Sequence, residues 1–225
     1  MIRTIFFDAA GTLIEPAEPV AAVYVRHFAA AGWEVSEAAV KGAFRTVFAT
    51  LPPPAYAAAA DGDSAERAWW RSVVEETARA SGIEATGGEF DACFANLFAH
   101  YASGEAWTVF PEVREVLARL REEGCRLAVV SNFDRRLHGI LADFGLDREF
   151  EVVVTSADAG ARKPDAAIFR HALAAMVARP SDTVHIGDHG LADGEGAAAV
   201  GIEAFVLDRP RTTLIDALGW LRLKN

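Results

Sequence analysis

The chain has 225 residues and a formal net charge of −10, and 52% of its residues are hydrophobic while 24% are charged. This balance is typical of a globular protein with its own core, and acidic charge without a Lys/Arg cluster argues against nucleic-acid binding. The longest stretch free of charges and histidine, residues 46–60, contains three consecutive prolines, so we expect no membrane span.

The N-terminus and the two cysteines favour a cytoplasmic location. Asp8 interrupts the first apolar run and no cleavage-type segment follows it, so we expect no signal peptide. Cys93 and Cys125 fall in different predicted elements, and we expect both to be buried as free thiols in a reducing compartment. Nothing in the sequence indicates the oligomeric state.

Short apolar runs alternate with amphipathic patterns over most of the chain. The runs predict buried strands at Thr4–Phe7, Leu127–Val130, Val152–Val154, Val184–Ile186 and Ala204–Leu207. The amphipathic patterns predict helices at Glu112–Glu123, Asp134–Phe144, Asp165–Ala178 and Leu191–Val200. Strand and helix in strict alternation predict an α/β fold with a Rossmann-like, doubly wound parallel sheet.

One long segment departs from this alternation. From Glu15 to Glu105 no strand is predicted, and helical patterns cover Pro19–Ala31, Glu37–Thr50, Ser64–Ala80 and Glu89–Ser103. About 90 residues of helix are too many for a crossover between neighbouring strands. The segment 15–105 is therefore predicted to be an all-helical domain inserted into an α/β core made of residues 1–14 and 106–225.

Polar side chains follow four of the predicted strands. In an open parallel sheet, ligands bind outside the carboxyl ends of the strands, so these loops are expected to meet at one edge. Carboxylate oxygens suit Mg²⁺, and several acids beside a single lysine would repel one another without a cation. The sequence therefore predicts a site for phosphate and Mg²⁺. Its residues, in chain order, are Asp8, Thr12, Ser131, Lys163, Asp188 and Asp193.

These loops resemble the four motifs of the haloacid dehalogenase superfamily, in the same order, and the inserted helices lie where that superfamily has its helical (type C1) cap. The resemblance implies a hydrolase in which Asp8 is the nucleophile and forms an aspartyl-phosphate. The resemblance also assigns a role to each of the other site residues. Thr12, Ser131 and Lys163 would be catalytic, Gly11 and Asn132 would bind substrate, and Asp8, the carbonyl of Ala10, Asp188 and Asp193 would hold Mg²⁺.

Ala10 is the important departure. Phosphatases of the superfamily carry a second Asp here, which protonates the leaving oxygen and then activates water. Such positioned acid–base groups contribute roughly 10²–10⁴ in rate. His189, next to Asp188, is a possible replacement, although a histidine at the start of a helix is the more common reading. His27 and His100 are weaker alternatives.

A branch of the superfamily named haloacid dehalogenase-like hydrolase domain-containing protein 3 resembles this chain in residues 7–12, in residues 131–134 and in Glu66, Trp69 and Trp70. Our expectation is a Mg²⁺-dependent hydrolase, a slow phosphatase on a small phosphorylated metabolite. One alternative is a non-catalytic binding protein with the same fold. Others are a 2-haloacid dehalogenase, which the retained Asp188 disfavours, and a phosphonatase, which would need Lys41 for a Schiff base.

Overall fold

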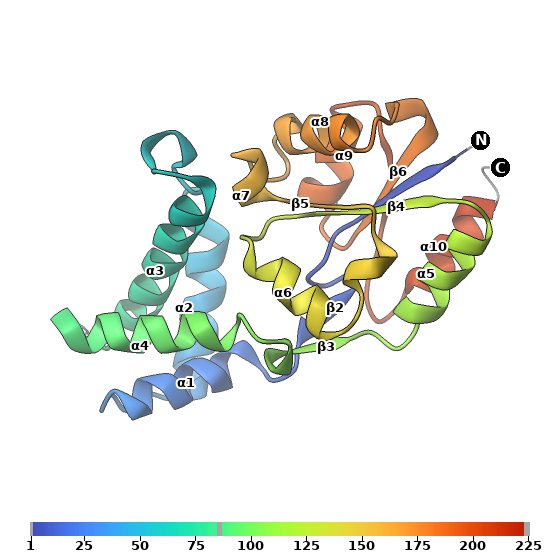
Figure 1. Cartoon of the computed structure of the whole chain (residues 1–225). Helices are drawn as coiled ribbons and strands as arrows, with labels where there is room; N and C mark the ends of the chain where they lie inside the picture. Colours follow the sequence, from blue (N-terminus) through green and yellow to red (C-terminus); the bar gives the residue numbers. More distant parts are fainter. Residues whose placement is uncertain (1, 85–86, 223–225) are drawn as a thin grey trace.

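The larger part of the molecule is built on a central five-stranded parallel sheet with the strand order β5-β4-β1-β6-β7 (Figure 1). The computed structural model describes residues 2–84 and 87–222. Its sheet confirms the predicted α/β, Rossmann-like fold. The strands are β1 (Thr4–Phe7), β4 (Arg126–Ser131), β5 (Val152–Thr155), β6 (Thr183–Gly187) and β7 (Glu203–Val206).

Helices cover both faces of this sheet because alternate residues of each strand point to opposite sides. Ile5 and Phe7 of β1 pack in one apolar cluster, whereas Phe6 packs in another. The first cluster includes residues of α5 (Val113–Glu122), α6 (Arg136–Asp143) and α10 (Leu214–Arg222). The second includes residues of α7 (Ser156–Ala159), α8 (Ala166–Ala175) and α9 (Gly196–Ala198). The central strands are therefore buried on both faces, as their uniform hydrophobicity predicted.

Three details of the core differ from the sequence expectation. The helix expected at 191–200 is instead a π-helical turn, η5 (Gly190–Glu195), followed by the short α9. The last strand is an edge strand, so Glu203 and Val206 are exposed. Helix α10 was not predicted, although its buried residues Leu214, Ala217, Leu218 and Leu221 follow helical spacing.

The inserted segment folds as four helices beside the sheet (left side of Figure 1). Helices α1 (Val20–Ala30), α2 (Glu37–Thr50), α3 (Gly62–Ala80) and α4 (Gly87–His100) lie close to the predicted ranges. They bury a separate apolar cluster that contains Tyr24, Phe28, Phe90, Phe94 and Leu97. A second small cluster joins α2 to α3 through Val47, Trp69 and Val73. We call residues 20–100 the cap and the rest the core.

Both passages of the chain between core and cap run through a small antiparallel pair of strands. Strand β2 (Ile14–Pro16) pairs with β3 (Trp107–Val109), so that Ile14 faces Val109 and Pro16 faces Trp107. The expectation of no strand after Glu15 was therefore wrong. Three residues containing a proline are too short to show a strand period, and only the distant partner strand defines β2.

The cysteines are both free, but only Cys93 is buried, whereas Cys125 is half-buried. Burial raises the pKa of Cys93 to about 11. Within residues 2–84 and 87–222, no helix is long and apolar enough to cross a membrane.

Candidate active site

The site lies at the carboxyl ends of three adjacent strands. Strands β4, β1 and β6 are neighbours in the sheet. Asp8 directly follows β1, Ser131 ends β4, and Asp188 directly follows β6. The chain moves outward from β1 in one direction through β4 and β5 and in the other through β6 and β7, which makes this the point where ligands bind in doubly wound sheets.

Lys163 is the cation at the centre of the site. Its buried Nζ atom donates hydrogen bonds to Oδ1 of Asp8 and to Oδ1 of Asp193, each over 2.6 Å. Burial alone would lower the pKa of Lys163, but the two carboxylates outweigh this effect and raise it. Lys163 is therefore charged and holds two acids together from opposite ends of the chain.

Asn132 holds the loop that carries Lys163. Its amide Nδ2 donates to the Lys163 carbonyl over 3.0 Å, and its Oδ1 accepts from the Lys163 amide over 2.7 Å. Both polar atoms of the side chain are thus used within the protein. Asn132 therefore positions the backbone of Lys163.

Asp193 is surrounded by donors. Besides Lys163, its Oδ1 contacts Nε2 of the fully buried His185 at 2.8 Å, and its Oδ2 accepts from the His189 amide at 2.9 Å. Burial opposes ionisation of Asp193, but Lys163 and His185 outweigh it and hold the pKa of this carboxyl below its usual range. Burial also lowers the pKa of His185, so this imidazole is neutral and its Nε2 carries the proton donated to Asp193.

Three carboxylates converge beside Lys163. Asp8, Asp188 and Asp193 each offer one ligand atom, and these atoms lie within 4.8 Å of one another. Burial raises the pKa of Asp8, and the charges of Asp193 and Asp188 add to that rise against the pull of Lys163. Burial and Asp193 likewise raise the pKa of Asp188. A hard divalent cation would relieve this repulsion, so the oxygen donor set fits Mg²⁺.

The three acids differ in how free they are to bind a metal. The side chain of Asp193 is buried and already accepts three hydrogen bonds, whereas Asp188 is exposed. Asp188 is thus suited to direct coordination, and Asp193 to orienting Lys163 and the residues around the metal. Asp8 would reach both the metal and the substrate.

Gly11 is required where it lies. Its φ is +87°, a left-handed conformation that favours glycine, and a Cβ atom there would come within 2.4 Å of Oδ2 of Asp188. The structure therefore brings Gly11 against the exposed carboxylate. Thr12 follows, with a buried Oγ1 that has no hydrogen-bond partner among the described residues. Ala10 is half-buried and forms an isolated β-bridge with Ile14, and its methyl side chain offers no acid or base.

The histidine considered as a replacement acid has another task. Nδ1 of His189 accepts a hydrogen bond from the Ala192 amide over 3.2 Å and so caps the π-helical turn η5. His27 and His100 lie in the cap, with their rings 5.7 Å apart. Lys41 is exposed on α2. Among the described residues, none of these four side chains joins the hydrogen-bonded cluster around Lys163, and His189 contributes only its backbone amide.

Sequence reasoning missed Arg209. Its guanidinium donates to the carbonyls of Gly11 and Thr12 over 3.1 and 2.8 Å, forms an ion pair with Glu112 at 2.8 Å, and lies 3.5 Å from the ring centre of Phe110. These contacts therefore hold the loop after β1 in place. As one of nineteen arginines without a distinguishing motif, it carries no signal in the sequence.

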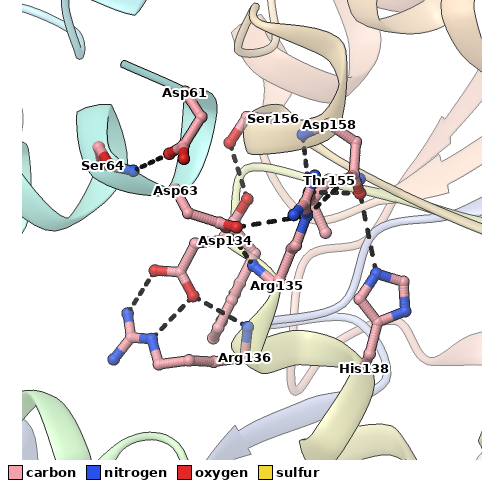
Figure 2. Close-up of polar contacts among 11 residues, drawn as sticks. Asp61, Asp63, Ser64, Asp134, Arg135, Arg136, His138, Thr155, Ser156 and Asp158 are labelled. Carbon is pink, nitrogen blue, oxygen red and sulfur yellow. Dashed lines mark hydrogen bonds and ion pairs between the residues drawn. The ribbon is translucent and has the colours of Figure 1, made fainter. Parts of the chain in front are cut away.

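Cap and core are joined by two groups of polar contacts. At the surface, Asp63 of the cap accepts a hydrogen bond from the Arg135 amide and pairs with its guanidinium at 3.2 Å (Figure 2). Deeper, the fully buried Glu66 accepts from Tyr56 and from Ser156 of the core, and lies 3.9 Å from Nε of Arg162. The loop next to Lys163 is thus tied to the cap.

A pocket of about 170 Å³ lies between cap and core. The cap contributes aromatic side chains such as Phe44, Phe48 and Trp70, and the core contributes Trp107 and Phe133. Ala10 also lines it, so the pocket extends to the loop that carries Asp8. Any substrate held at Asp8 has this apolar space beside it.

Comparisons with known proteins agree with this geometry. A model of the haloacid dehalogenase-like hydrolases matches residues 2–201. A zebrafish (Danio rerio) protein named haloacid dehalogenase-like hydrolase domain-containing protein 3 is 35% identical over 92% of this chain and 86% of its own length. A phosphoserine phosphatase of Thermus thermophilus is 26% identical over 92% and 89%.

A solved structure shares the fold. That of the L-2-haloacid dehalogenase RSc1362 covers 98% of this chain and 99% of its own, with a TM-score of 0.76 and 21% identity. Because its identity is low, this likeness concerns the fold alone. The family match spans most of the chain, and the carboxylates, the lysine and the hydroxyls occupy the loops that the motifs predicted. The chain belongs to the haloacid dehalogenase-like hydrolases.

Proposed function

We propose that this hydrolase is a Mg²⁺-dependent phosphatase that acts slowly on a small phosphate ester through an aspartyl-phosphate on Asp8. The observation that carries the proposal is the pairing of Asp8 with Lys163 at 2.6 Å inside a group of three carboxylates. This arrangement supplies a nucleophile, a fixed positive charge for the phosphoryl oxygens and oxygen ligands for a metal. The likeness to a phosphoserine phosphatase supports the same reaction class.

The reaction has two displacements. In the first, a carboxylate oxygen of Asp8 attacks phosphorus, the bond from phosphorus to the ester oxygen breaks, and the leaving group departs with the electron pair. In the second, water attacks the aspartyl-phosphate, inorganic phosphate leaves, and the carboxylate of Asp8 is restored. Bound Mg²⁺ would neutralise the phosphoryl charge. Asp8, Asp188 and the Ala10 carbonyl would hold it.

Lys163 and the two hydroxyls complete the site. Lys163 would keep Asp8 ionised and bind a phosphoryl oxygen. Thr12 would contribute a hydroxyl that has no partner within residues 2–84 and 87–222, and Ser131 would bind the transferring group from the end of β4. Asn132 would act through Lys163, whose backbone it holds. Gly11 would allow the loop to approach Asp188.

The test is a panel of phosphorylated metabolites assayed for phosphate release with and without Mg²⁺. We expect weak, metal-dependent release that is abolished in Asp8→Asn, which removes the nucleophile. Asp147→Asn is the matched control, because it removes the same charge from an exposed position in the turn after α6. Release that survives in Asp8→Asn would contradict the proposed mechanism.

A non-catalytic binding protein is the second candidate, and Ala10 is the observation that favours it. Such a protein would keep the metal site and the pocket but turn over no ester. Binding of Mg²⁺ with no Asp8-dependent phosphate release across the panel would support this alternative and overturn the phosphatase.

A further inference from the structure

The pocket between cap and core has walls that select an uncharged, apolar group. Its lining residues, all within the described part of the chain, include one charged side chain, Arg136. That guanidinium is already paired, because its Nε and Nη2 donate to the Asp134 carboxylate at 2.8 Å (Figure 2). Its Nη1 donates to the Phe98 carbonyl at 2.9 Å. The walls also carry the hydroxyls of Tyr24 and Tyr101, and the buried hydroxyl of Tyr101 has no hydrogen-bond partner among the described residues. A charged or heavily hydroxylated group placed here would gain few partners for the water it loses, which is costly.

The size of the pocket matches one ring. An apolar cavity of roughly 150 Å³ is known to accept benzene, and this pocket measures about 170 Å³. Its walls include the aromatic residues Phe44, Phe48 and Trp107, and aromatic side chains favour an aromatic occupant. The pocket is thus suited to a single aromatic ring.

Ala10 limits which leaving groups can depart when the bond from phosphorus to the ester oxygen breaks. It lines the pocket two residues after Asp8, at the position where an acid would protonate the departing oxygen. An alcohol is about as weak an acid as water, whose pKa is roughly 15.7. An alkoxide therefore leaves poorly unless an acid protonates it. A phenolate, whose parent phenol has a pKa of about 10 as in tyrosine, leaves far more readily.

We propose that the substrates are aryl phosphate monoesters, with the ring in the pocket of Phe44, Phe48 and Trp107 and the phosphoryl group at Asp8. The inference rests on the proposed phosphatase function and names its substrate class. Oδ of Asp8 forms a bond to phosphorus, the bond from phosphorus to the phenolic oxygen breaks, and phenolate departs with the electron pair. It takes its proton from solvent afterwards, so Ala10 need supply none.

Three esters separate the two parts of this proposal. Benzyl and ethyl phosphate both release an alkoxide but differ in the ring, and phenyl phosphate has the ring with a phenolate leaving group. At saturating Mg²⁺ we expect kcat/KM for benzyl phosphate to exceed that for ethyl phosphate by about 10- to 100-fold, as expected for burying a ring. Phenyl phosphate should exceed benzyl phosphate by at least about 100-fold.

A variant that fills the pocket tests its location. Val20 lines the pocket at the start of α1, whereas Val25, on the same helix, packs in the cap core. Val20→Phe should lower the ratio of kcat/KM for phenyl over ethyl phosphate by about tenfold or more, and Val25→Phe should leave it unchanged. Should Val20→Phe fail to fold, Phe48→Ala, at a half-exposed ring of the wall, should lower the same ratio.

The outcomes distinguish this inference from the proposed function. Equal kcat/KM for benzyl and ethyl phosphate, with turnover lost in Asp8→Asn, would overturn the aryl pocket and leave the phosphatase standing. A ring preference that Val20→Phe and Phe48→Ala do not reduce would also overturn it. If no ester is hydrolysed above the level of Asp8→Asn, both proposals fail together.

Discussion

At the scale of single residues, the site is organised by Lys163. The bonds from its Nζ to Asp8 and Asp193 cross about 155 and 30 positions of sequence, and Asn132 fixes its backbone. Burying an unpaired charge is costly. The buried charges of Lys163, Asp8 and Asp193 are tolerated because each has a partner of opposite sign. Asp188 lies outside these hydrogen bonds and close to Gly11.

The first prediction concerns Mg²⁺. A metal that binds the native state stabilises it, so under the proposed function millimolar Mg²⁺ should raise the melting temperature measured by calorimetry. Asp188→Ala should abolish the rise, because it removes the exposed ligand. Asp147→Ala, which deletes an acid elsewhere, should preserve it. If Mg²⁺ does not change the melting temperature of the wild-type protein, the metal site is contradicted and a metal-free reaction is favoured.

The second prediction concerns the missing acid. Ala10→Asp should restore proton transfer and raise turnover of an alkyl phosphate by up to about 10²–10⁴, the contribution of a positioned acid–base group. Para-nitrophenyl phosphate should gain less, unless hydrolysis of the aspartyl-phosphate limits its turnover. Rates are to be compared at saturating Mg²⁺, because the added charge strengthens metal binding.

An absence of any gain in Ala10→Asp, with the fold intact and Mg²⁺ bound, would mean that another group supplies the proton or that the site performs no phosphoryl transfer. His189→Ala separates these readings. Because the ring of His189 caps η5 in the structure, we expect this variant to lower stability slightly and to retain turnover.

At the scale of elements, the contacts between cap and core are of two energetic kinds. Asp63 and Arg135 form exposed ion pairs, which typically contribute about 0–1 kcal/mol. Glu66 is buried, and its Oε1 accepts hydrogen bonds from Tyr56 of the cap and Ser156 of the core. Removing this buried acceptor would take the carboxylate from Tyr56 and break the link between α3 and Ser156, although Ser156 would keep its hydrogen bond to the Phe133 carbonyl. The deeper contact therefore fixes helix α3 on the core.

The third prediction compares these two contacts directly. Glu66→Ala should lower the free energy of unfolding by about 2 kcal/mol, because it removes the buried acceptor of the Tyr56 hydroxyl and the carboxylate next to Arg162, while Ser156 keeps only its hydrogen bond to the Phe133 carbonyl. Asp63→Ala should lower it by about 0.5 kcal/mol or less. Urea unfolding monitored by tryptophan fluorescence measures both. Equal effects would show that the buried carboxylate is no more important than the surface pair.

At the scale of the whole molecule, the fold alone does not choose the reaction. The chain superposes on an L-2-haloacid dehalogenase with a TM-score of 0.76, and its sequence is similar to that of a phosphoserine phosphatase. The reaction depends instead on the side chains at the strand ends, where Asp188 lies near Asp8. Asp188 beside Asp8 adds a negative charge that would repel a carboxylate substrate but would hold a metal for a phosphate.

The fourth prediction follows from that charge. We expect no chloride release from L-2-chloropropionate, measured by ion chromatography with and without Mg²⁺. Metal-independent chloride release that disappears in Asp8→Asn would reverse the ranking of phosphatase over dehalogenase.

The sequence by itself determined the sheet, the helical insertion and the four loops of the site. Uniformly apolar runs such as Leu127–Val130 signal buried parallel strands, and the amphipathic period locates the helices between them. Asp8, Ser131 and Asp188 could be grouped in advance because each follows a strand, and the ends of parallel strands share one edge. These signals are local in the chain.

Only the tertiary structure decided features that depend on distant partners. Strand β2 exists because β3 pairs with it more than ninety residues later, and Arg209 supports the loop of Gly11 from 198 positions away. Asn132 proved to hold Lys163, because their loops lie side by side at the ends of β4 and β5. The pocket beside Ala10 arises where the cap meets the core. Such contacts leave no period or motif in the sequence, since their free energy is gained only when the folded chain brings the two segments together.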